Sequence, residues 1–90
     1  MIVKITDFSQ EESSVTYEIL DLNEIQLNFL KENLVGEVDC DGNILVFKNY
    51  FDKEIFPFKS LESKLKIEDF KAREEIEMTF FLTSLLEDII

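Results

Sequence analysis

The sequence lacks histidine and tryptophan, and it has one cysteine (Cys40), one proline (Pro57) and two glycines (Gly36 and Gly42). Without histidine, the chain has neither the usual acid/base group of neutral pH nor the usual partner of a serine or cysteine nucleophile. The two isolated glycines exclude a glycine-rich phosphate-binding loop. A single cysteine excludes an internal disulfide and suits a reducing compartment. We therefore predict a protein that is not an enzyme and that binds no cofactor.

Basic residues are scarce and unevenly spread. The 90 residues include 9 Lys and Arg against 20 Asp and Glu, a net charge of −11. Residues 1–47 have a balance of −8, residues 48–73 one of +2 and residues 74–90 one of −5. A surface of this sign disfavours nucleic acid and anionic membranes as direct ligands, and it favours a basic partner. The alternative is that the acids only keep the protein soluble.

Long hydrophobic runs are also missing. The longest, residues 78–86, is too short to span a bilayer. The first seven residues lack the apolar region of a signal peptide. We therefore expect a cytoplasmic protein with no membrane association.

What the chain does contain is enough apolar material for one folded domain over residues 1–90. Hydrophobic residues make up 46% of it, including nine phenylalanines. Alternating apolar residues predict strands over 2–8 and 14–20. A helical pattern over 21–35 follows, with Asp21 as the expected cap, Glu24 completing a capping box and Gly36 closing the helix.

A second helix is expected from about Glu68 to Leu86. Between the helices, residues 36–51 predict a hairpin, and Pro57 makes the extended segment 55–58 an edge strand or a loop. Residues 60–67 fit a strand or a helical turn equally. The sequence thus predicts an α+β fold in the order β-β-α-β-β-(β)-α, with an antiparallel sheet of four or five strands and the long C-terminal helix packed on it.

The hairpin carries the most distinctive arrangement of charge. Its turn is expected near Asp41-Gly42-Asn43, and its return arm is apolar on both faces, which predicts a place in the middle of the sheet. In the first arm Glu37, Asp39 and Asp41 alternate with apolar residues, so the three carboxylates share one face. They are spaced by roughly 6.5–7 Å, comparable to consecutive phosphates along a nucleic-acid strand. A solvated sheet face is the alternative explanation.

Other acids extend this candidate partner-binding surface. We expect Glu11, Glu12 and Glu18 to add to it from the N-terminal hairpin, and Glu74 and Glu77 to form a further pair on the last helix. Cys40 lies between two acids, which disfavours a reactive thiolate, and its alternation places it on the opposite, buried face. The segment from Asp39 begins like a calcium loop, but the glycine and the final glutamate are misplaced, so no metal site is expected.

The last helix shows two apolar sides. We expect its packing side to consist of Phe70, Met78, Phe81, Leu82, Leu85 and Ile89. Ile76, Phe80 and Ile90 fall on the opposite side, and an apolar set left over from the core suggests a homodimer contact. Alternatively, Phe80 packs under the segment 56–58.

In size, acidity and its carboxylate row, the chain resembles the small DNA-mimic proteins with which phages block restriction enzymes and host nucleic-acid-binding proteins. The resemblance implies an inhibitor that occupies the DNA-binding surface of a host defence nuclease or similar protein in the host cytoplasm. Immunity proteins and antitoxins that neutralise cationic nuclease toxins share this profile. A dimeric adaptor domain that works through its hydrophobic C-terminal helix is the third hypothesis.

Overall fold

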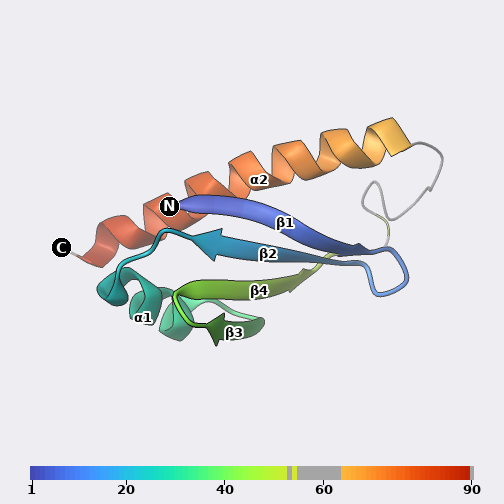
Figure 1. Cartoon of the computed structure of the whole chain (residues 1–90). Coiled ribbons are helices and arrows are strands. Elements are labelled where there is room, and N and C mark those ends of the chain that lie inside the picture. Colours follow the sequence, from blue (N-terminus) through green and yellow to red (C-terminus); the bar gives the residue numbers. More distant parts are fainter. Residues whose placement is uncertain (53, 55–63, 90) are drawn as a thin grey trace.

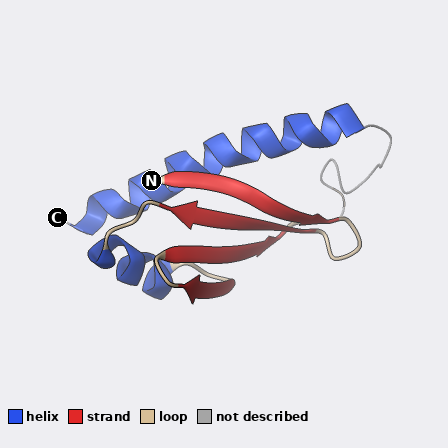
Figure 2. Ribbon diagram, viewed as in Figure 1, coloured by secondary structure: helices blue, strands red, loops and turns tan. Residues whose placement is uncertain are grey.

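The computed structural model describes residues 1–52, 54 and 64–89 (Figure 1). Its elements are β1 (Ile2–Ser9), β2 (Ser14–Leu20), α1 (Glu24–Asn33), β3 (Glu37–Asp41), β4 (Ile44–Tyr50), α2 (Lys64–Leu86) and a final 3-10 turn (Glu87–Ile89). The α+β prediction is confirmed, with four antiparallel strands and two helices (Figure 2). The segment 55–58 and Ile90 lie outside the described residues.

The strand order is β1-β2-β4-β3, so the sequence order is interrupted once. Each neighbouring pair is antiparallel. β4 therefore lies between β2 and β3, as its apolar pattern predicted, and β1 and β3 form the two edges. The hairpin β3–β4 closes at Gly42, whose φ of +62° suits a tight turn.

One face of the sheet forms the core with the helices. Tyr17 pairs with Ile5 on one side and with Phe47 on the other, and its ring stacks on that of Phe47 at 6.1 Å. Ile19 and Leu45, paired one row along, are fully buried. Burying an aliphatic side chain of this size contributes about 1.5–3 kcal/mol. From the helices, the residues Leu27, Leu30, Phe70, Met78 and Leu82 complete this core.

The opposite face of the sheet carries no helix among residues 1–52, 54 and 64–89. Alternation places on it the side chains between the core positions. One row runs Lys4–Glu18–Val46–Asp39 across the four strands. We call this side the open face.

The first helix begins later than the sequence predicted. Asn23, not Asp21, is the N-cap: its side chain accepts a hydrogen bond from the backbone N–H of Gln26, and the Gln26 side chain accepts one from the Asn23 N–H. Asp21 instead has a left-handed backbone, with φ of 61°. It reverses the chain after β2, so it cannot also hold the extended conformation of a cap. The helix ends at Asn33, and Gly36 adopts its positive φ at the entry to β3.

The second helix begins earlier than predicted, at Lys64, so residues 64–67 of the ambiguous 60–67 segment are helical. α2 runs beside β1 (Figure 1). Phe70, Met78 and Leu82 are buried as expected, but Phe81 is 51% exposed. Phe81 lies at the border of the packing side and lines a surface hollow with Val35 and Met78, so the prediction that it packs on the sheet was wrong.

Candidate acidic interface

Strand β3 presents its three carboxylates at an edge of the open face. Glu37, Asp39 and Asp41 are all exposed, while Val38 and Cys40 between them are half-buried and pack toward the core. The predicted alternation is therefore present, and we call these three side chains the acidic row. They come from an edge strand, so solvent reaches them both from above the sheet and from its side.

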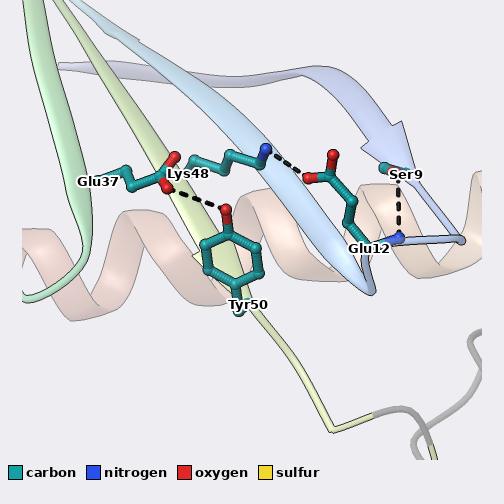
Figure 3. A network of polar contacts seen from close by, with 5 residues as sticks. All are labelled: Ser9, Glu12, Glu37, Lys48 and Tyr50. Atoms are coloured by element: carbon teal, nitrogen blue, oxygen red, sulfur yellow. Dashed lines mark hydrogen bonds and ion pairs between the residues drawn. The ribbon is translucent and has the colours of Figure 1, made fainter.

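Two hydrogen bonds orient this row. The Tyr50 hydroxyl donates to Glu37 Oε1 at 3.0 Å (Figure 3). The backbone N–H of Cys40 donates to Asp39 Oδ1 at 2.8 Å. A carboxylate that covers an N–H of an edge strand also discourages a foreign strand from pairing there. Each of the two carboxylates keeps a second oxygen for a partner.

Lys48 lies opposite Glu37 in the β3–β4 register, yet its ammonium group turns the other way. It forms an ion pair with Glu12 at 2.5 Å across β2 and lies 5.3 Å from the centre of the Tyr50 ring (Figure 3). The hydrogen bond that the Lys48 ammonium donates to the Glu12 carboxylate is the main reason that the pKa of Lys48 is raised. Within the described part of the chain, no ion pair involves the acidic row.

A shallow hollow of about 560 Å³ adjoins the row. Glu37 and Asp39 form one side of it, and Val46 and Thr16 lie beneath. Lys48 also lines the hollow, but its ammonium group is turned toward Glu12. The hollow combines negative charge with an aliphatic floor, which suits the ammonium or guanidinium group of a long basic side chain.

The remaining predicted site residues divide between two places. Glu18 shares a row of the open face with Asp39, and Glu11 and Glu12 lie in the turn between β1 and β2. Glu12 is already paired with Lys48. Glu74 and Glu77 belong to α2, which lies on the core side of the sheet, so they do not extend the acidic row.

Glu74 has an interior contact instead. The hydroxyl of the fully buried Tyr17 donates to Glu74 Oε2 at 3.3 Å. Partial burial, and then the negative charge of Glu77, raise the pKa of Glu74. Burial and the neighbouring Glu74 carboxylate likewise raise the pKa of Tyr17. This glutamate thus helps to position α2 on the sheet.

Sequence reasoning missed Glu75, which satisfies the other edge of the sheet. At the irregularity in β1 between Ile5 and Asp7, the Ile5 N–H donates to Glu75 Oε2 at 2.8 Å. The two residues are 70 positions apart. No local pattern could have distinguished Glu75 from its neighbours Glu74 and Glu77.

Among the described residues, no group of three or more Cys, Asp or Glu side chains could hold a metal ion. Cys40 is a free, half-buried thiol whose Sγ donates to the Gly42 carbonyl at 3.2 Å. No helix in the described ranges is both long and apolar enough to cross a bilayer. The open face therefore presents the carboxylates of the acidic row beside aliphatic and aromatic side chains, and it also carries Lys4 and Lys48.

Comparison with known proteins shows which family the chain resembles. The model for a family of unknown function, DUF5750, matches residues 2–88. The chain belongs to this family. It is also similar to bacitracin synthase 1 of Bacillus licheniformis, with 34% identity over 89 residues. That match covers 97% of this chain but only 2% of the length of the synthase.

Proposed function

We propose that the protein is a non-enzymatic acidic inhibitor that imitates the DNA backbone and blocks the DNA-binding surface of a host defence nuclease or another nucleic-acid-binding protein. The observation that carries the proposal is the acidic row, Glu37, Asp39 and Asp41, exposed on one side of an edge strand with no ion pair among the described residues. A basic groove built for phosphates would meet carboxylates at a similar spacing.

The charge around the row favours a cationic partner over nucleic acid itself. Glu18 adds a carboxylate from β2, and Lys48, the nearest cation in register, is occupied by Glu12. Association with a DNA-binding protein would release the same counterions that DNA binding releases, so its affinity should fall steeply with salt. We place this activity in the cytoplasm, where such a partner works.

The test compares two triple variants with the same change of charge. Glu37→Gln/Asp39→Asn/Asp41→Asn neutralises the row. The control, Glu24→Gln/Glu32→Gln/Asp88→Asn, neutralises three exposed acids of the helical layer. Each variant serves as bait in pull-downs from a lysate at low and high salt, followed by displacement with DNA or heparin.

We expect the wild type and the control to capture DNA-binding proteins that heparin releases, and the row variant to lose most of this capture. Equal capture by both variants would show that the row is not the contact, because the net charges are the same. Capture that neither salt nor heparin weakens would contradict backbone mimicry.

An immunity protein or antitoxin for one cationic nuclease is a second candidate, and the apolar part of the open face favours it. Ile2, paired with Leu20, and Tyr50, paired with Ser14, are each 49% exposed at opposite ends of this face, and the half-buried Val46 lies in a row between them. A specific protein interface uses such apolar and aromatic contacts inside a charged rim. This function requires one partner, bound at nanomolar strength or tighter and partly retained at high salt.

A further inference from the structure

The outward side of α2 carries a continuous stripe of exposed residues. Its members are spaced alternately by four and three positions, so they lie one above another on the helix. They are Asp69, Arg73, Ile76, Phe80, Thr83 and, in the final 3-10 turn, Glu87, and all are exposed. We call this set the α2 stripe. Met78 and Leu82, which are buried in the core, lie on the other side of the helix.

The middle of the stripe is apolar. Ile76 is 58% exposed and Phe80 is 70% exposed, because both lie on the side of the helix that faces away from the sheet. A groove of about 450 Å³ runs along the flank of α2 between this side and β1, and it is lined by Val3, Ala72, Glu75 and Thr79 together with Ile76 and Phe80. A helix that is apolar on its outward side as well as toward its core needs a second surface to cover it.

The charges on either side of this apolar centre differ in sign. The change from the basic segment 48–73 to the acidic segment 74–90 falls inside α2, between Arg73 and Glu74. Two copies of α2 in antiparallel contact, related by a two-fold axis near the middle of the helix, would place the basic end of each against the acidic end of the other. Ile76 of each copy would then face Phe80 of the other.

One charged pair makes the arrangement specific. Side chains on a helix lean toward its N-terminus, and Arg73 does so, with its guanidinium 3.4 Å from Asp69. With Ile76 opposite Phe80, an antiparallel second copy presents its Glu87 opposite Asp69, so that the Arg73 guanidinium lies between the two carboxylates. The guanidinium has five N–H donors and can bind two carboxylates at once. We propose that the α2 stripe is the contact of a homodimer, with Phe80 and Ile76 at its centre and an Arg73–Glu87 ion pair at each end.

The proposal is independent of the acidic row, which lies on the other layer of the protein. It is tested by light scattering and sedimentation on the whole chain, from about 1 to 500 µM, at physiological salt. We expect the mass to rise from 10.6 kDa toward twice that value. Phe80→Glu should keep the mass at that of the monomer. The control, Ile25→Glu, adds the same charge at a 65% exposed position of α1 and should leave the dimer intact.

A charge exchange tests the orientation of the two helices. Arg73→Glu or Glu87→Arg alone should raise the dissociation constant of the dimer at least tenfold. The double variant should restore the dimer, because each ion pair forms again with the acidic and basic residues exchanged. Circular dichroism confirms that every variant is folded. A monomer mass at 500 µM, a dimer that survives Phe80→Glu, or a double variant no stronger than the single ones would overturn the proposal.

Discussion

Gly36, next to the acidic row, is the position where both backbone conformation and packing disfavour any side chain. Its φ is +132°, a conformation that side-chain-bearing residues rarely adopt, and it directly precedes β3. A Cβ at this position would lie 3.1 Å from Cε1 of Phe47 and 3.3 Å from the backbone oxygen of Lys48. Phe47 is only 4% exposed, so its ring has little freedom to move away.

Gly36→Ala should therefore destabilise the fold for two reasons. Forcing alanine into this conformation costs about 1–3 kcal/mol. The close contacts with Phe47 and with the Lys48 oxygen add about 1 kcal/mol or more, since a packed core accommodates an extra methyl group poorly. We expect a loss of about 3 kcal/mol in the free energy of unfolding, which is a large part of the usual stability of a small domain.

Gly42→Ala is the matched control within the same hairpin. Its φ of +62° is also positive, but an added Cβ would meet no atom within 4 Å. The expected loss is about 1 kcal/mol, from backbone conformation alone. Urea denaturation followed by circular dichroism gives both values, and about 4–8 °C of melting temperature corresponds to each kcal/mol. If Gly36→Ala costs no more than Gly42→Ala, the argument from the Phe47 contact is refuted.

Three further changes test the helices. Because the pKa of Glu74 is raised above its usual 4.5, its contribution to stability is complete at low pH and is lost as the pH rises through the folded-state pKa. Glu74→Gln should then stabilise the protein at pH 7–8 by about 0.5 kcal/mol, a small gain because the group is only partly buried. This difference from the wild type should vanish near pH 4. Denaturation curves at several pH values that show a constant difference would contradict this. Asn23→Ala should cost about 1 kcal/mol of unfolding free energy because the helix loses its N-cap. Asp21→Asn should cost almost nothing, since Asn tolerates the left-handed backbone. Equal losses in the two variants would indicate that Asp21 is the N-cap after all. Leu82→Ala removes a fully buried side chain and should cost about 2–5 kcal/mol in the same denaturation assay, and a loss below 1 kcal/mol would mean that α2 is not held on the sheet as described.

The sequence determined those features that depend on neighbouring residues. The alternation over residues 14–20 predicted β2 with its observed bounds, and Asp41-Gly42-Asn43 predicted the turn of the β3–β4 hairpin. The same alternation placed the acidic row on one face of β3. These predictions were correct because side-chain direction in a strand and backbone conformation in a tight turn are set within a few residues.

Tertiary structure decided how the acids and the aromatic residues were divided. Three glutamates lie close together in α2, yet Glu74 meets Tyr17, Glu75 meets the Ile5 N–H and Glu77 stays exposed. Their partners are in β1 and β2, dozens of residues away along the chain. The position of the sheet relative to the helix therefore gave each one its role. Burial likewise separated Phe81 from Leu82, its neighbour on the predicted packing side.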